Sequence, residues 1–264
     1  MNRRQFLGGL VVIASGFAAP FDAFARTAGI NDVINKTGRQ RMLSQRLAKA
    51  YLQLGQAIEV EHSKKILDTS IGQFDRQLTE LNAFAPTSDN KTTLTDMEKT
   101  WQSYKQLLTG RTPNQQDARS IMSVNEDVLA LAQAATDQLE KYSGTSAGRM
   151  VSMSGRQRML SQRMAKFYQA MHWNVAPADA AAKLELSRND FINAMKVLDA
   201  APGNTPKIRD ELALARQQWS FFDAALRQDG DAKSRAQDAT NVATTSERIL
   251  EAMDNITDLY QQLA

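Results

Sequence analysis

Apolar residues recur at helical spacing along most of the chain, and short breaks rich in proline and glycine separate the stretches that carry them. The breaks lie around Pro86, Gly110, Gly144, Pro177, Pro202 and Gly230. Between them the spacing predicts helices over about 30–59, 62–84, 92–109, 116–142, 149–175, 178–200, 206–228 and 232–263. Beyond residue 25, runs of β-branched residues, which favour strands, are absent. The pattern therefore predicts an all-α fold.

The second half of the chain repeats the first. The segment Gly38–Lys49 returns as Gly155–Lys166 with a single difference, Leu47 against Met164. A match of this length indicates an internal duplication. Each repeat then holds four predicted helices with short connections, which favours two tandem up-down four-helix bundles.

The glycine-containing segment Ser143–Gly148 is the predicted boundary between the repeats. It divides the chain into expected domains at 26–143 and 144–264, preceded by a leader at 1–25. If this segment reverses the chain, the first helices of the two bundles run parallel. The two bundles would then form an internal pseudo-dimer, and a monomer would be sufficient for function.

On a helix the repeated segment shows two opposite stripes. One is apolar and suits the interior of each bundle: Leu43, Leu47, Ala50, Leu54 and, in the second copy, Leu160, Met164, Phe167, Met171. The other has small, hydroxyl and aromatic residues with one arginine: Thr37, Arg41, Ser44, Ala48, Tyr51 and Ser154, Arg158, Ser161, Ala165, Tyr168. Its spacing is that of a seam between packed helices. We therefore expect the two seams to face each other, with Arg41 opposite Arg158.

The charge pattern adds a candidate ligand. From Val33 to Ile58, and again from Lys141 to Ala178, every charged residue is basic. Two arginines that meet across a seam without carboxylates repel each other strongly at low effective dielectric. A planar anion between them removes that repulsion and matches the geometry of guanidinium groups. A solvated basic face is the alternative, but the recurrence of Arg41 and Arg158 on the seam favours an anion site. Arg39 and Arg46 lie on another line of the helix, where surface or inter-helix bonds are expected.

The segment Asn35–Arg46, with its pattern G-x-x-R-M-x-S-x-R, resembles the P-box of bacterial nitrate/nitrite sensor kinases. It is also similar to the N-terminal (PilJ-type) domain of type IV pilus methyl-accepting transducers. In those families the domain is a periplasmic four-helix bundle that dimerises, and one P-box arginine from each subunit holds nitrate. The resemblance implies a nitrate or nitrite site with these residues: Arg41, Arg158, Gly38, Gly155, Ser44, Ser161 and Lys36. Here both copies lie in one polypeptide, without a kinase or methyl-accepting module.

The beginning of the chain predicts export. The pair Arg3-Arg4 precedes an apolar stretch, Gly8–Ala19, that is too short to span a bilayer, and Ala23-Phe24-Ala25 offers a cleavage site. Residues 1–25 therefore read as a twin-arginine signal peptide, with an ordinary Sec signal as the alternative. No other stretch approaches the length of a membrane span, so we expect a soluble periplasmic protein. The chain has no cysteine, which excludes disulfides and thiolate-bound metals.

Other classes of function have little support in the sequence. The two histidines, His62 and His172, are not duplicated between the repeats, and no nucleophile–base pair suggests an enzyme. The methionines of 150–171 could suit copper(I), but Met164 and Met171 align with Leu47 and Leu54 and are better explained as core residues. We expect no cofactor and no metal, and the compartment excludes nucleic acid.

Two hypotheses of function remain. The first is a sensory protein that binds a small oxyanion, nitrate or nitrite, and signals through a membrane sensor kinase, chemoreceptor or transporter. The second is an adaptor whose basic helices dock on the acidic surface of a membrane receptor without binding a small ligand.

Overall fold

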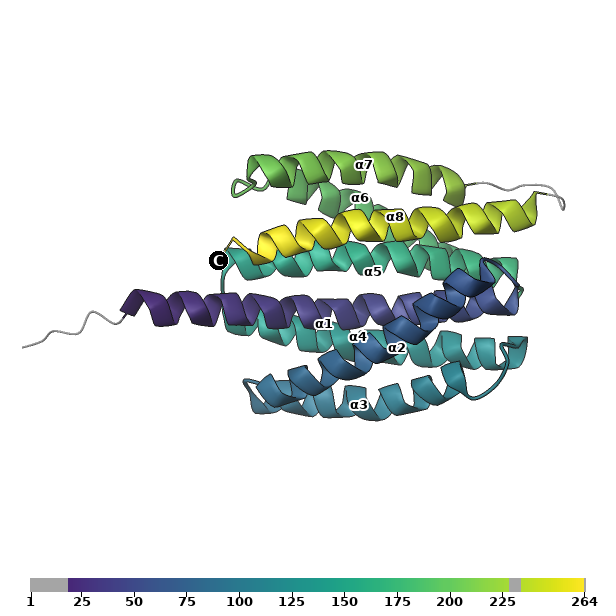
Figure 1. Cartoon of the computed structure of the whole chain (residues 1–264), viewed down its shortest axis with the longest axis horizontal. Helices are drawn as coiled ribbons and strands as arrows, with labels where there is room; N and C mark the ends of the chain where they lie inside the picture. The colour runs from purple at the N-terminus through teal and green to yellow at the C-terminus, as the bar shows by residue number, and fades with distance from the viewer. Residues whose placement is uncertain (1–18, 228–233, 264) are drawn as a thin grey trace, which may run out of the picture.

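The computed structural model describes residues 19–227 and 234–263, and side chains from residue 29 onward. These ranges contain the helices α1 (Ala19–Gly55), α2 (Val60–Phe84), α3 (Ser88–Thr109), α4 (Gln115–Ser143), α5 (Ser146–His172), α6 (Ala180–Asp199), α7 (Pro206–Leu226) and α8 (Arg235–Gln261) (Figure 1). No strand occurs within the described ranges, which confirms the all-α prediction.

Local sequence signals set the helix ends, both at the repeat boundary and at the start of α7. Gly144 ends α4 in the left-handed conformation, with a φ of 63° that glycine adopts without strain. The side chain of Thr145 then accepts a hydrogen bond from the amide of Gly148, 3.0 Å away, and so caps the first turn of α5. Thr205 caps α7 in the same way, and Pro206 follows at the first helical position.

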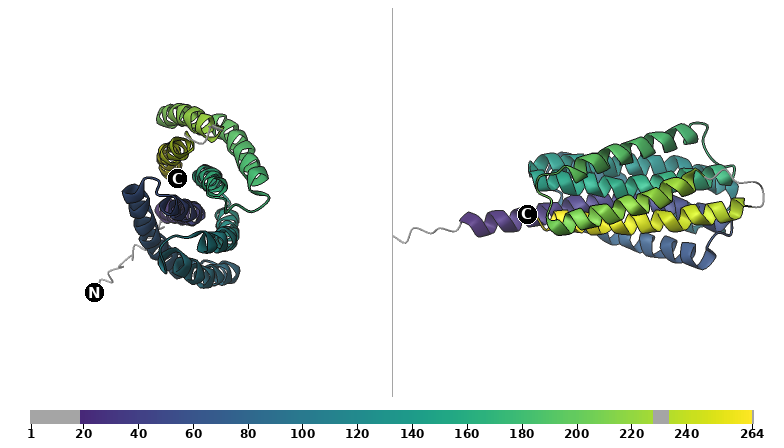
Figure 2. Two further views of the ribbon diagram at one scale, coloured as in Figure 1. Left: turned by 90° about the vertical axis from the view of Figure 1, so that its right-hand side faces the viewer. Right: turned by 90° about the horizontal axis from the view of Figure 1, so that it is seen from above.

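The helices form two tandem four-helix bundles, α1–α4 and α5–α8, as the sequence predicts. The bundles lie side by side, with α1 and α5 at the centre, and α1 packs more extensively on α5 than any other pair of helices (Figure 2). In each bundle the second helix packs on the first and the third on the fourth. The N-terminal turns of α1 extend past the other helices (Figure 1).

The two bundles have equivalent cores. The apolar stripe is buried as predicted, except that Leu54 and Met171 are half-buried at its end. Phe74 stacks on Trp101 with ring centroids 3.9 Å apart, and Phe191 stacks on Trp219 at 4.4 Å. Such pairs add roughly 0.5–1.5 kcal/mol beyond the burial of their surface. The duplication has therefore preserved the aromatic packing as well as the repeated segment.

Helices α1 and α5 run parallel. Near one end of the contact, Arg158 Nη2 on α5 donates to Asn35 Oδ1 on α1 at 2.6 Å. Near the other end, Gln56 Nε2 donates to the carbonyl of Gln169 at 3.2 Å. The seam residues between these points are buried: Thr37, Ser44, Ala48, Tyr51, Ser154, Ser161 and Ala165. The predicted seam is thus buried where the two repeats meet, except at its end, where Tyr168 is half-buried and packs against Ile58, Ala239 and Ala243.

The start of α1 differs from the sequence prediction. The apolar spacing begins this helix at about residue 30, whereas α1 begins at Ala19. Residues 19–25 of the predicted signal peptide therefore lie in α1, and residues 1–18, including the arginine pair, lie outside the described residues. None of the described helices has both the length and the apolar character needed to cross a membrane.

Candidate functional site

Arg41 and Arg158 meet at the contact between α1 and α5. Both side chains are almost completely buried, at 1% and 0% exposure. Gly38 and Gly155 lie one turn earlier on the same helices. A Cβ atom built on Gly38 would lie 3.2 Å from Arg41 Nη2 and 3.7 Å from Arg158 Nη2, and one built on Gly155 would lie 3.2 Å from Arg158 Nη2 and 3.7 Å from Arg41 Nη2. The two guanidinium groups therefore converge beside both glycines. Because glycine has no Cβ atom, there is room for the guanidinium groups at this point.

Arg41 has neutral hydrogen-bond partners. Its Nη1 donates to Gln133 Oε1 on α4 at 2.8 Å, and its Nη2 donates to the carbonyl of Ser152 on α5 at 3.0 Å. Burial lowers the pKa of Arg41 from 12.5 to about 9, and the charges of Arg156 and Arg158 act in the same direction. The group stays protonated at neutral pH, and a nearby anion would stabilise it.

Arg158 has a carboxylate partner. Its Nη1 donates to Asp254 Oδ1 on α8, and its Nη2 donates to Asn35 Oδ1 on α1. Burial lowers the pKa of Arg158, and the negative charge of Asp254 opposes this shift. The expectation that both arginines lack a carboxylate is therefore right for Arg41 and wrong for Arg158.

Each guanidinium group keeps an unused donor. The Nε atoms of Arg41 and Arg158 are buried and have no hydrogen-bond partner among the described residues. The Nε–H and Nη2–H groups of an arginine lie along one edge, with a spacing that matches two oxygens of a planar anion. An unsatisfied buried donor is costly, and an oxyanion between the two groups would satisfy both. Each of the two guanidinium groups therefore has one buried N–H that is free to donate to a further acceptor.

The last two cations of each repeated segment are neutralised across the repeat boundary, whereas Arg156 pairs with Asp190 of its own repeat. Arg163 and Lys166 on α5 contact the carboxylate of Glu126 on α4, at 2.7 Å each. Arg46 and Lys49 on α1 contact Glu247 on α8 in the same way. The stretches of sequence that lack acidic residues therefore have acidic neighbours in the folded protein, because each repeat supplies a glutamate to the other.

Arg39 forms an inter-helix bond of the kind that the sequence predicts. Its Nη2 donates to Asp254 on α8 at 2.9 Å, so that Asp254 contacts both Arg39 and Arg158. Arg46 also forms an inter-helix bond, because its Nη2 donates to Glu247 on α8. The prediction is therefore confirmed for both arginines.

Three of the predicted ligand residues do not contact the guanidinium groups. The hydroxyls of Ser44 and Ser161 donate to the carbonyls of Arg41 and Arg158 on their own helices, at 2.8 Å each. Lys36 is partly exposed and forms ion pairs with Asp32 on α1 and with Glu80 on α2. The sequence did not predict the four groups that accept hydrogen bonds from the guanidinium groups. They occupy equivalent positions of the two repeats and are the side chain of Asn35 and the carbonyl of Ser152, and the side chains of Gln133 and Asp254. The last helices of the two repeats align at an offset of 121 residues, which pairs Glu126 with Glu247 and also Gln133 with Asp254.

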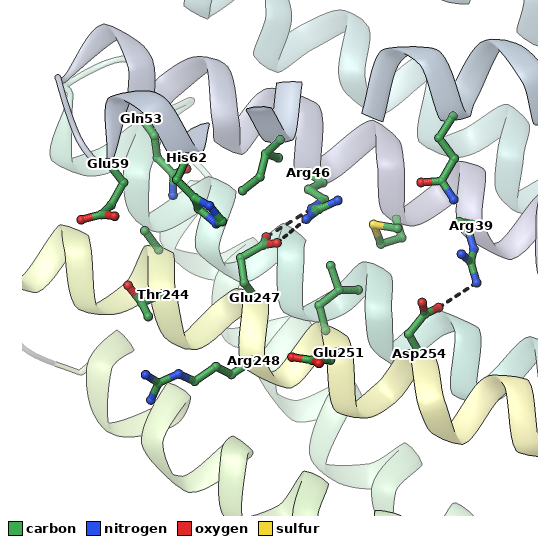
Figure 3. A pocket seen from close by; sticks show the side chains of 15 residues that line it. Arg39, Arg46, Gln53, Glu59, His62, Thr244, Glu247, Arg248, Glu251 and Asp254 are labelled. Atoms are coloured by element: carbon green, nitrogen blue, oxygen red, sulfur yellow. Dashed lines mark hydrogen bonds and ion pairs between the residues drawn. The ribbon is translucent and has the colours of Figure 1, made fainter. Parts of the chain in front are cut away.

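Two surface grooves lie next to side chains that accept hydrogen bonds from the buried arginines. A groove of about 590 Å³ between α1, α2 and α8 is lined by Arg39, Glu247 and Asp254, among others (Figure 3). A groove of about 380 Å³ between α4, α5 and α6 includes Gln133 and Arg163. Neither groove is lined by Arg41 or Arg158, but the first is lined by Asp254, which accepts a hydrogen bond from Arg158, and the second by Gln133, which accepts one from Arg41.

The fold and this contact define a class of protein: a tandem helical-bundle repeat with two buried arginines at its internal interface. Residues 24–137 and 143–249 both match the family model described as "Type IV pili methyl-accepting chemotaxis transducer N-term", and the chain belongs to this family, with two copies of its domain. The family is a sensory one, whose domains are periplasmic in the transducers. Comparison with curated proteins and with solved structures gave no match.

Proposed function

We propose that this protein is a periplasmic sensor that binds one small planar oxyanion, nitrate or nitrite, between Arg41 and Arg158 and signals through a membrane partner. The observation that carries the proposal is the convergence of two buried guanidinium groups with an unused Nε–H on each. Membership of a sensory family supports the signalling role. The partner would be a sensor kinase, a chemoreceptor or a transporter.

The arrangement favours a single anion and a monomer. Each half of the site comes from a different repeat of the same chain, so one polypeptide supplies both arginines. The two Nη2 atoms lie beside the same two glycines, so the groups share one space rather than two. Arg41 has no carboxylate among its hydrogen-bond partners and lies beside a second buried guanidinium group. One shared anion would stabilise this pair more than water can, because the site is shielded from solvent.

The adaptor hypothesis has less support. It needs basic side chains that are free to meet an acidic surface. Arg46 and Lys49 are instead committed to Glu247, and Arg163 and Lys166 to Glu126. The basic character of the repeated segment therefore serves the contact between the repeats.

Isothermal titration calorimetry with nitrate, nitrite, sulfate and acetate tests the proposal. We expect one site per chain for nitrate or nitrite, weaker binding of sulfate and acetate, and loss of binding when Arg41 is replaced by alanine. Two anions per chain, or affinity that is unchanged in Arg41→Ala, would contradict it.

The export route is part of the same proposal. Residues 1–25 would act as a twin-arginine signal peptide, because an arginine pair precedes a short apolar stretch and small residues. Replacing Arg3 and Arg4 with lysine should leave the precursor in the cytoplasm. A normal periplasmic yield of that variant would instead indicate Sec export.

A further inference from the structure

The two halves of the candidate site differ in one charged group. Gln133 on α4 and Asp254 on α8 occupy equivalent positions, and each accepts a hydrogen bond from Nη1 of a buried arginine. The acceptor is a neutral amide beside Arg41 and a carboxylate beside Arg158. Asp254 also accepts from Arg39 at 2.9 Å. The site is therefore symmetric in position but not in charge.

The grooves that flank the two halves differ in the same direction. The groove next to Asp254 has more acidic than basic side chains: Glu59, Glu247, Glu251 and Asp254 against Arg39, Arg46 and Arg248. The groove next to Gln133 has more basic than acidic side chains: Arg156, Arg163 and Lys183 against Glu126 and Asp190. An anion is accordingly favoured on the Gln133 side and disfavoured on the Asp254 side.

We infer that Asp254 is a built-in competitor for the anion, and that the half formed by Arg41 and Gln133 is the principal binding half. This inference rests on the proposed function. In the absence of ligand Asp254 neutralises Arg158, whereas Arg41 has no carboxylate among its hydrogen-bond partners. An incoming oxyanion has to share Arg158 with a carboxylate that repels it. Asp254 thereby sets the affinity of the whole site.

The energetics follow from the two acceptors. A bond between a guanidinium and a carboxylate is charge-assisted and about twice as strong as one between neutral groups, so Asp254 is harder to displace than Gln133. Displacing Gln133 also leaves no charge unpaired, because the amide is neutral. Displacing Asp254 from Arg158 leaves a carboxylate close to the bound anion, and like charges in a poorly solvated site interact strongly.

Three variants test the inference by calorimetric titration with sodium nitrate, with sodium chloride as the reference anion. Asp254→Asn keeps the shape of the side chain and removes its charge. We therefore expect nitrate affinity to rise about tenfold, which corresponds to about 1.4 kcal/mol of binding free energy. Gln133→Asp places a second competing carboxylate at the equivalent position, and we expect affinity to fall about tenfold. The double variant Gln133→Asp, Asp254→Asn exchanges the two halves and should bind within about threefold of the original protein.

The possible failures are distinguishable. If the unaltered protein binds nitrate through Arg41 but Asp254→Asn binds it no more tightly, the competitor role is wrong and the proposed function stands. If Asp254→Asn melts at a much lower temperature and cannot be titrated, Gln133→Asp decides, because unchanged affinity in that variant also overturns the inference. If neither the original protein nor any of the three variants binds nitrate or nitrite, the proposed function is wrong and the competitor role falls with it.

Discussion

Lys166 on α5 and Glu126 on α4 form an ion pair across the repeat boundary, with Nζ and Oε1 2.7 Å apart. Lys166 is completely buried, and burial lowers its pKa from 10.5 to about 7. Lys49 and Glu247 make the reciprocal pair in the other direction. Each bundle thus contributes a cation to the acid of the other, and the contact between the bundles is specified by charge as well as by shape.

These reciprocal pairs make the two glutamates important for stability. In Glu126→Gln, the charges of Arg163 and Lys166 would remain in a largely buried position without a carboxylate. Breaking one partner of a buried pair typically costs about 3–5 kcal/mol, so we expect a lower free energy of unfolding in urea by an amount of this order. Asp68→Asn, in the exposed pair with Lys64, is the control and should change stability by less than about 1 kcal/mol. A loss in Glu126→Gln no larger than in this control would show that the pair is not structural.

The same glutamates predict a loss of stability in acid. Burial raises the pKa of Glu126 and of Glu247, but the pairing cations together outweigh it and hold both pKa values at about 2, below the ordinary value of 4.5. Because the unfolded chain takes up these protons first, the stability that the two groups contribute is complete above about pH 4.5 and is lost as the pH falls towards 2. Urea unfolding followed by circular dichroism at pH 7, 4 and 3 should show this decline. In the variant with both Glu126→Gln and Glu247→Gln the slope between pH 4.5 and 3 should be shallower, and an identical slope would contradict the assignment.

The sequence predicts the helices, the duplication and the meeting of Arg41 with Arg158, because these depend on spacing within one helix and on its repetition. It does not predict Asp254 or Glu247 as partners, because their contacts depend on how α8 packs beside α1 and α5, far away in the chain. The seam serines show a different limit. A hydroxyl at such a position can reach across the seam or bond its own backbone, and in Ser44 and Ser161 the local bond to the preceding turn prevails.

Gly38 should separate ligand binding from stability. Alanine is the better helix former by about 1 kcal/mol, but its Cβ would lie 3.2 Å from Arg41 Nη2, in the space beside the guanidinium groups. We expect Gly38→Ala to keep or raise the melting temperature while it weakens nitrate binding, because the Arg41 side chain must shift by a few tenths of an ångström. Gly72→Ala on α2 is the matched control, since its Cβ would meet only the flexible end of Arg76. Equal nitrate affinities in the two variants would show that the glycine does not shape the site.

Removal of either buried arginine should weaken nitrate binding. Each contributes a charge-assisted contact worth about 1.5–3 kcal/mol, so Arg41→Ala and Arg158→Ala should each weaken nitrate binding by roughly 10- to 100-fold. The double variant should lose less than the sum of the two, because both groups act on one anion. Arg46→Ala is the control: it removes a cation that pairs with Glu247, so it should lower stability and leave affinity nearly unchanged. Nitrate should also raise the melting temperature of the original protein, since a ligand bound only by the folded state stabilises it. Calorimetry and thermal unfolding measure both effects, and a melting temperature that nitrate raises equally in Arg41→Ala would place the anion elsewhere.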